Sequence, residues 1–328
     1  MSQDRYGLET HARRRSRRIR RLRENLVGYS FIAPAVGLFL AIGLFTVVFS
    51  VVLSFFQWKG VDFKLMVYRG VTYNFRRFLF GFEDPFLPPA VARAVWHNIQ
   101  MLVGLVVTIP LSLVIAVALR RVRRFQTAFR TIYFLPMVAS GVAIYYMWMG
   151  VLAPDGLINN WLRALGLGGL AAKNGWLAQP NTALWTLVGT GIWSALPGAM
   201  ILYYAGLQTV DNDLYEAAEV DGASKWQQLL HVTWPMLRPM TVILVVNGLA
   251  NMFSAFEHVW VMTQGGPAGS TEVIGTMLYQ MAFYGFSGYQ GRLDLGLAAA
   301  ISWFLFLFTF GFSIISVRYL QRDWIGDK

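Results

Sequence analysis

The sequence contains no cysteine, and only five of its 328 residues are lysine. Without cysteine, the chain can hold no disulfide, no thiolate metal ligand and no cysteine nucleophile. A P-loop needs a lysine directly after a glycine, and none of the lysines follows one: Lys59, Lys64, Lys173, Lys225 and Lys328. We therefore expect any energy from nucleotide to reach this chain through another subunit.

Charge is also scarce, because charged residues make up 14% of the chain and hydrophobic residues 56%. A soluble surface usually has about a quarter of its residues charged. The composition therefore predicts an all-α polytopic membrane protein. Six nearly uncharged stretches reach the roughly 20 residues that a helix needs to cross a bilayer: Phe31 to Phe56, Ile99 to Leu119, Thr131 to Val151, Ala183 to Leu207, Thr241 to Val261 and Leu295 to Val317.

The positive charges alternate along the chain and predict its orientation. Lysine and arginine number 9, 5, 2 and 3 in residues 1–28, 120–130, 208–240 and 318–328, against 6, 2 and 1 in residues 57–98, 152–182 and 262–294. Because cytoplasmic loops carry the excess of positive charge, both termini are predicted to be cytoplasmic. The expected divisions are a basic tail over 1–28, a transmembrane domain over 29–320 and a short tail over 321–328.

The arginine-rich N-terminal tail has two interpretations. It could bind nucleic acid, but beside a membrane span a role in topology and in contact with lipid headgroups is favoured. We therefore expect membrane lipid as a partner and no nucleic acid. The first span is too long for a signal peptide and lacks a clear small-residue cleavage site, so we expect it to be retained.

The longest cytoplasmic loop, 208–240, predicts two short helices around Gly222. Asp213 to Glu216 has the spacing of a capping box, and Ser224 to Gln227 repeats it. Gly222 lies where a chain leaving a helix commonly needs a positive φ. Leu214, Ala217 and Ala218 can share one face, and an acidic edge is formed by Glu216, Glu219 and Asp221. On these grounds alone, a plain linker between two spans and a docking element are equally reasonable.

This loop also resembles a known motif. Glu216-Ala217-Ala218, then Gly222 after three residues and Val232 and Pro235 further on, closely resembles the EAA loop of ABC importer permeases. Family members usually have Ile and Leu at Val232 and Trp234, and both changes keep these positions apolar. The resemblance implies a coupling helix that sits in a cleft of an ATP-binding subunit, carried by Glu216, Ala217, Ala218, Asp221, Gly222, Ala223 and Pro235.

Four more stretches resemble sugar-transport permeases of the maltose and glycerol-phosphate type: Phe129 to Pro136, Ala153 to Asn159, Thr263 to Pro267 and Gly296 to Ala300. The resemblance implies the type I ABC importer permease architecture and a place in a bacterial or archaeal inner membrane. It also implies a heterodimer with a second, different permease, two ATP-binding subunits, an external solute-binding protein and a sugar or oligosaccharide substrate. We expect no cofactor in this chain, because ATP and Mg would be bound by the partner subunits.

Polar residues inside a span point to a pathway, because a bilayer makes isolated polar groups costly. In the fifth span, Asn247, Asn251, Ser254 and His258 follow helical spacing, and Glu257 is the one acidic residue within a predicted span. Small polar residues inside a span can also form hydrogen bonds between packed helices. Intramembrane polarity places Asn251, Ser254, Glu257 and His258 in a candidate substrate pathway. The resemblance implies that the pathway includes Met252, Ser254 and Ala255, then Trp193, Ser194 and Gly198, and then Ser140, Gly141 and Tyr145.

These side chains suit a neutral carbohydrate, since amides and hydroxyls bind sugar hydroxyls and aromatic rings pack on sugar rings. Two rival functions remain at this point. A proton-coupled secondary transporter could use Glu257 and His258 as a relay. A membrane enzyme could use Glu257 with His258 or His97 as acid and base, although no metal-ligand spacing or third catalytic partner accompanies them.

Overall fold

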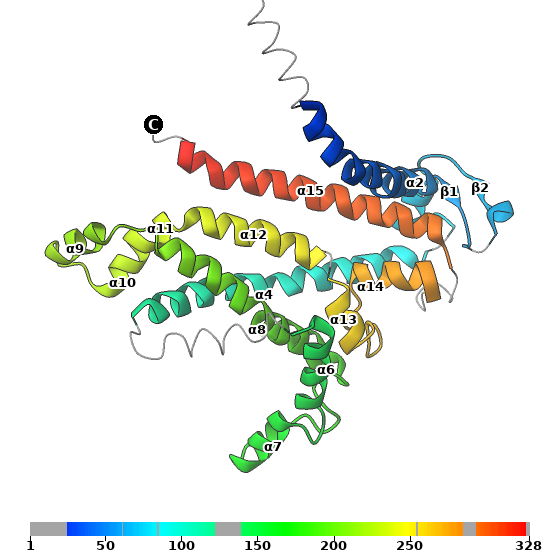
Figure 1. Ribbon diagram of the computed structural model, residues 1–328. Coiled ribbons are helices and arrows are strands. Elements are labelled where there is room, and N and C mark those ends of the chain that lie inside the picture. Colours follow the sequence, from blue (N-terminus) through cyan, green and yellow to red (C-terminus); the bar gives the residue numbers. More distant parts are fainter. Residues whose placement is uncertain are drawn as a thin grey trace, which may run out of the picture.

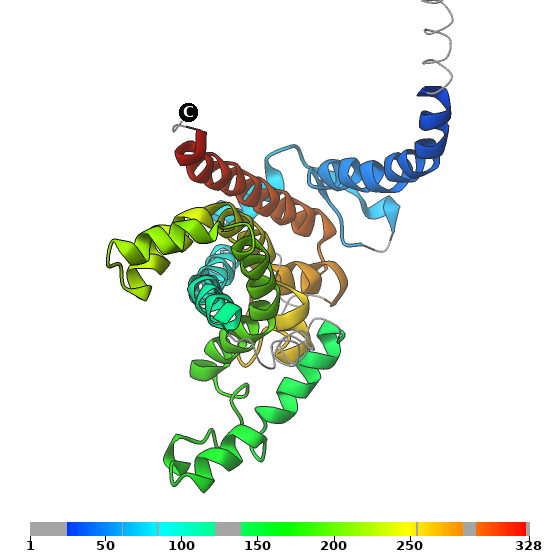
Figure 2. The ribbon, with the colours of Figure 1, turned by 60° about the vertical axis from the view of Figure 1, so that its left-hand side comes forward.

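A computed structural model describes residues 25–60, 62–83, 85–121, 139–253, 255–284 and 293–325. These residues are helical apart from turns and one short antiparallel hairpin, β1 (Phe56–Gln57) with β2 (Val67–Tyr68). The all-α fold class predicted from composition is therefore confirmed. Most of the longer helices run side by side in one elongated bundle, the N-terminal helix points away from it, and shorter helices extend from it (Figures 1 and 2).

Four of the described helices are long and apolar enough to cross a membrane, namely Asn25–Leu53, Leu87–Arg120, Pro180–Leu207 and Leu295–Ile315. The first contains η1 (Phe39–Leu44) and α2 (Phe45–Leu53), and the other three belong to α4 (Leu87–Arg121), α8 (Pro180–Leu207) and α15 (Leu295–Ile325). A bent pair, Lys225–Met236 with Arg238–Asn251, would make a fifth. The predicted spans at these positions are confirmed as helices, with shifted ends.

The first predicted span was wrong at its C-terminal end, because α2 stops at Leu53 and Phe56 belongs to β1. The side chain of Asn74 accounts for this early end of the helix. Its amide Nδ2 donates to the carbonyls of Ser54 at 2.9 Å and Phe56 at 2.8 Å. A buried polar group is costly to leave unpaired, and the carbonyls at this end of the helix accept from Asn74 instead of from a following helical turn, so these bonds stabilise the exit from the helix.

The fifth predicted span is not one helix. It divides into α12 (Arg238–Phe253) and α13 (Glu257–Met262). The break packs against α14 (Ile274–Tyr279), where a Cβ on Gly275 would lie 2.9 Å from the carbonyl oxygen of Ala255. The single helical face predicted through Asn251 and His258 was therefore wrong, since the helix is interrupted between them. Of the third predicted span, the structure describes α6 (Gly141–Val151), and residues 131–138 lie outside the described ranges.

The centre of the bundle is the long contact of α4 with α8, and α12 packs on α4 and α15. Gly248 allows α12 to pack closely against α4, because a Cβ at this position would lie 2.3 Å from Leu105 Cδ1 of α4. One apolar cluster joins α4, α8 and the beginning of α12, with Tyr203 and Leu237 fully buried. A second joins α6, α8 and α13, and a third joins α3 (Tyr73–Phe80), α4, α14 and α15.

The end of the bundle that carries β1 and β2 is fastened by α15. Leu295 N donates to Trp58 O at 2.9 Å, and a Cβ on Gly296 would lie only 1.9 Å from Phe56 O. Only glycine allows this approach. The following residues, Leu297 to Ala300, are buried. The stretch Gly296 to Ala300 singled out in the sequence is thus a packing element of the helix N-terminus.

Candidate functional site

The EAA-like segment forms four short helices that project from the opposite end of the bundle (Figure 1). They are α9 (Asn212–Val220), α10 (Lys225–Gln228), η4 (Leu229–Thr233) and α11 (Trp234–Met236). The N-cap of α9 is Asp211, whose Oδ1 accepts from Asp213 N at 3.1 Å. The predicted capping box at Asp213 was wrong, because an N-cap needs extended backbone and Asp213 is already helical.

The turn between α9 and α10 is as predicted. Gly222 has φ +76°, and Ala223 N donates to Ala218 O at 2.9 Å, which closes the C-terminus of α9. Ser224 Oγ accepts from Gln227 N while Gln227 Oε1 accepts from Ser224 N, so the second capping box is confirmed. The turn geometry is therefore fixed locally by two caps and one glycine.

Several apolar side chains of α9 and α10 are exposed. Val220 is 88% exposed and Trp226 63%, and Leu214 and Ala217 are also exposed. Of the face predicted from Leu214, Ala217 and Ala218, the first two residues are therefore open within this chain and Ala218 is half-buried. An exposed apolar patch rimmed by polar residues is typical of a surface that another protein covers.

The acidic edge of the loop is divided by one ion pair. Lys225 Nζ donates to Glu219 Oε1, and this hydrogen bond lowers the pKa of Glu219. Glu216 and Asp221 stay exposed on the surface of the loop. Sequence reasoning missed the residue that anchors α9, Tyr215. Its hydroxyl lies 3.0 Å from Thr233 Oγ1, and the guanidinium of Arg120 lies 5.3 Å from its ring centre.

Pro235 lies at the start of α11, two residues before a sharp change of direction. The chain bends by 70° between Lys225–Met236 and Arg238–Asn251, around the fully buried Leu237. Proline cannot donate a backbone hydrogen bond and disfavours a continuous helix. The projecting helices are therefore joined to α12 by a fixed angle rather than by a straight extension.

A cavity of about 390 Å³ lies between α4, α6, α8, α12 and α13. It is lined by five of the residues predicted for the pathway: Tyr145, Asn251, Ala255, Glu257 and His258. Gly141 adjoins it, because a Cβ there would lie 3.3 Å from Glu257 Oε1. The broken fifth span thus still brings Asn251 and His258 to one place, through the break rather than through a common helical face.

His258 is held on two sides at the wall of this cavity. Its Nε2 lies 2.9 Å from Thr190 Oγ1, and its ring stacks on Tyr145 with 4.9 Å between ring centres. A ring fixed by both contacts has one orientation. Sequence reasoning missed Thr190, although it precedes the predicted Ser194 by one helical turn and its carbonyl accepts from Ser194 Oγ at 2.9 Å.

Apart from Gly141, four of the described residues predicted for the pathway do not line the cavity: Trp193, Ser194, Gly198 and Ser140. Trp193 packs edge-on against Trp148, Ser140 is the exposed N-cap residue of α6, and Gly198 lies further along α8. Ser254 lies outside the described residues, and so does the side chain of Met252. A polar group that was not predicted is Thr108 of α4, a buried lining residue whose hydroxyl has no hydrogen-bond partner within the described ranges.

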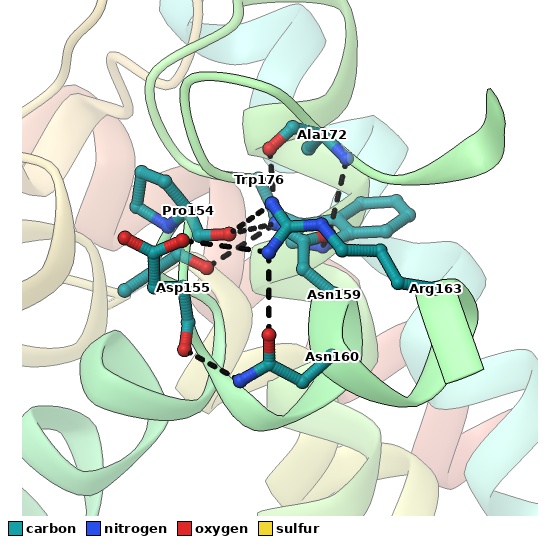
Figure 3. Close-up of polar contacts among 8 residues, drawn as sticks. Pro154, Asp155, Asn159, Asn160, Arg163, Ala172 and Trp176 are labelled. Atoms are coloured by element: carbon teal, nitrogen blue, oxygen red, sulfur yellow. Dashed lines mark hydrogen bonds and ion pairs between the residues drawn. The ribbon is translucent and has the colours of Figure 1, made fainter. Parts of the chain in front are cut away.

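The stretch Ala153 to Asn159 forms a rigid corner before α7 (Leu157–Ala164) (Figure 3). Asn159 is fully buried, and its Nδ2 donates to the carbonyls of Ala153, Pro154 and Ala172. Its Oδ1 accepts from Ala172 N at 3.1 Å and from Trp176 Nε1 at 3.0 Å. One side chain therefore ties two ends of a long turn together.

The predicted turn after the fifth span is confirmed at Gly265 to Pro267, which follow α13. Gly265 has φ +85°, and a Cβ there would lie 2.4 Å from Glu272 Oε2. Glu272 is 9% exposed, and its Oε1 accepts from Thr276 Oγ1 at 2.6 Å. Burial raises the pKa of Glu272 to about 7. The glycine therefore makes room for a buried carboxyl that titrates near neutral pH.

Comparison with known proteins decides the family. Residues 108–324 match the family described as "Binding-protein-dependent transport system inner membrane component". The chain belongs to this family. It is thus the membrane-embedded permease of a binding-protein-dependent ABC transporter, and the comparisons give no support to a proton-coupled secondary transporter.

The permease is similar to "Probable ABC transporter permease protein YurN" of Bacillus subtilis (strain 168), with 30% identity over 90% of this chain and 96% of the relative. It is also similar to "Lactose transport system permease protein LacF" of Rhizobium radiobacter, with 31% identity over 78% of this chain and 83% of LacF. Its fold matches a chain of a bacterial alginate ABC transporter in complex with an alginate pentasaccharide-bound periplasmic protein. The TM-score is 0.72 at 21% identity, over 93% of this chain and 96% of that chain.

Proposed function

We propose that this permease imports a sugar or oligosaccharide, delivered by an external solute-binding protein, into the cytoplasm by alternating access. The cavity beside the broken fifth span supports this proposal. It presents an amide, a carboxyl and an imidazole beside an aromatic ring, a set that can bind hydroxyls and pack on a sugar ring. A relative named for lactose and a structural neighbour named for alginate are consistent with a carbohydrate.

The exposed EAA-like helices support coupling to an ATP-binding subunit. Glu216 offers a charge-assisted contact, Ala217 and Ala218 permit close approach, and the outward Val220 and Trp226 supply apolar area. The 70° bend after Pro235 would transmit movement of this loop to α12. In this arrangement the partners are two ATP-binding subunits, which bind ATP and Mg, and a second, different permease. This chain contributes no ATPase site.

The proposal places the loop and both termini in the cytoplasm of a bacterial or archaeal cell. The C-terminal end of α15 lies on the same side of the bundle as α9 and α10, and α14 lies on the opposite side (Figure 1). This arrangement supports an external position for the turn at Gly265 to Pro267, where a solute-binding protein could dock.

ATP-dependent uptake in vesicles tests the proposal, with this chain co-expressed with its partner permease, ATP-binding subunit and binding protein. We expect Glu216→Ala combined with Gly222→Pro to abolish uptake and weaken ATPase docking while the subunits still reach the membrane. Asp213→Ala, an exposed acidic residue on the same helix, is the matched control and should transport normally. Normal uptake by the double variant, or uptake by the wild-type chain alone on a proton gradient, would contradict the proposal.

A further inference from the structure

Five aromatic side chains at the junction of α13, α14 and η5 (Gln280–Tyr284) form a continuous series, here called the aromatic ladder: Phe256, Trp260, Tyr279, Phe283 and Tyr284. Ring centres of Phe256 and Tyr279 lie 4.7 Å apart, and those of Trp260 and Tyr279 are also 4.7 Å apart. Tyr279 continues to Phe283 at 5.1 Å and to Tyr284 at 5.5 Å. Each of these ring pairs therefore lies within the contact range of aromatic pairs.

The backbone brings these rings together at Gly275. Because a Cβ there would lie 2.9 Å from Ala255 O and 3.2 Å from Phe256 Cβ, glycine allows α14 to approach the break in the fifth span. Tyr279 lies one helical turn further along α14 and meets both Phe256 and Trp260. The ladder is thus built by the same packing that interrupts the span.

One end of the ladder opens into the cavity and the other end is open on the surface. Phe256 lines the cavity together with Asn251, Glu257 and His258. Phe283 and Tyr284 are each 66% exposed. A continuous series of rings therefore leads from the surface of the chain to the candidate substrate site.

The chemistry of the ladder fits carbohydrate better than lipid anchoring. Aromatic faces pack on the C–H face of a sugar ring, which makes a cluster of rings a suitable surface for a pyranose. Residues that only anchor a protein at a membrane interface need no contact with one another and no connection to an internal cavity. Here Tyr279 contacts the other four rings, and one of these, Phe256, belongs to the cavity wall.

We propose that the aromatic ladder is a stacking path along which pyranose rings pass from the external surface into the cavity. This inference rests on the proposed function in sugar import. It assigns to Trp260 and Tyr279 a direct contact with the moving substrate and to Phe283 and Tyr284 the first contact.

Uptake by the full transporter in vesicles tests the ladder, with lactose, maltotriose and an alginate pentasaccharide as probes. The variants are Trp260→Leu, Tyr279→Leu and Tyr284→Leu, each paired with the phenylalanine variant of the same residue. Leucine preserves apolar area but has no aromatic face, whereas phenylalanine preserves both. Phe306→Leu on α15, an exposed ring that contacts Phe310 outside the ladder, is the control. ATP hydrolysis stimulated by the binding protein is measured in parallel.

We expect each leucine variant to lower the sugar imported per ATP hydrolysed, by about tenfold for Trp260 and Tyr279. The phenylalanine variants and Phe306→Leu should stay near wild type, and stimulated ATP hydrolysis should persist throughout. Leucine variants that import sugar as wild type does, or that import as much as their phenylalanine counterparts, would contradict the proposal that the aromatic ladder is a stacking path. If the wild-type transporter imports none of the three sugars, the proposed function itself fails. If the wild-type transporter imports one of these sugars and every leucine variant imports it equally well, only the proposed role of the aromatic ladder fails.

Discussion

The guanidinium of Arg77 lies 2.8 Å from the carboxylate of Asp294, and both side chains are only 3% exposed. The pair joins α3 to the start of α15, 217 residues further along the chain. Arg77 also donates to Asn74 Oδ1, and Asp294 Oδ1 accepts from Leu297 N at the first turn of α15. The network therefore fastens the segment that carries β1 and β2 to the last long helix.

Removing one partner of this pair should destabilise the permease strongly. Arg77→Met or Asp294→Asn leaves a buried group without its counter-charge, at a cost of about 3–5 kcal/mol. Thermal unfolding of the purified complex measures the effect. The double variant should be less destabilised than the sum of the two single variants, by about 1–3 kcal/mol. Strict additivity would show that the two charges do not stabilise each other.

Gly222 should tolerate asparagine but not valine. Its φ of +76° is a left-handed conformation that costs most side chains about 1–2 kcal/mol, and asparagine adopts it more readily. We expect Gly222→Val to weaken retention of the ATP-binding subunit in a pull-down and to reduce uptake, while Gly222→Asn keeps both. Equal behaviour of the two variants would mean that the turn conformation does not matter for coupling.

Asn159 should be essential for the corner before α7 (Figure 3). Asn159→Ala removes five hydrogen bonds and leaves buried groups such as Trp176 Nε1 unpaired, at about 1–3 kcal/mol for each such group. Trypsin should then cleave faster after the exposed Lys173. Asn160→Ala, at the neighbouring exposed position, should leave the cleavage rate unchanged. Equal rates for both variants would disprove the role of Asn159.

Glu272 should make stability depend on pH. Its pKa is about 7 in the fold against 4.5 in an unfolded chain, so between these values the unfolded state loses a proton that the folded state keeps. Stability is therefore highest below pH 4.5, falls as the pH rises towards about 7, and is level above it. At 1.36 kcal/mol per pKa unit, the total change is roughly 3 kcal/mol.

Thermal unfolding of wild type and Glu272→Gln from about pH 5 to about pH 8 checks this dependence. The glutamine variant should lose the slope that Glu272 contributes. Glu216→Gln on the exposed loop should keep it. A wild-type slope that survives in Glu272→Gln would assign the pH dependence to another group.

Local signals predicted much of the EAA-like loop and little of the pathway. The spacing of Ser224 and Gln227 and the position of Gly222 predicted caps and a turn correctly, because such features depend on a few neighbouring residues. Asp213 was predicted as the N-cap of α9, but Asp211 takes this position. Both are aspartates that can cap, and the choice depends on where the backbone enters the helix. The break between α12 and α13 left no clear periodic signal, because packing of α14 at Gly275 stabilises it.

The sequence by itself determined that the chain is a helical membrane protein, which stretches are apolar enough to cross a bilayer and where the EAA-like motif lies. These properties follow from composition, hydrophobic run length and short-range spacing. The tertiary structure decided that His258 meets Thr190 and Tyr145, that Arg77 meets Asp294 and that the aromatic ladder reaches the cavity. Each of these contacts joins residues from different helices, and their meeting depends on how whole helices pack rather than on any local pattern.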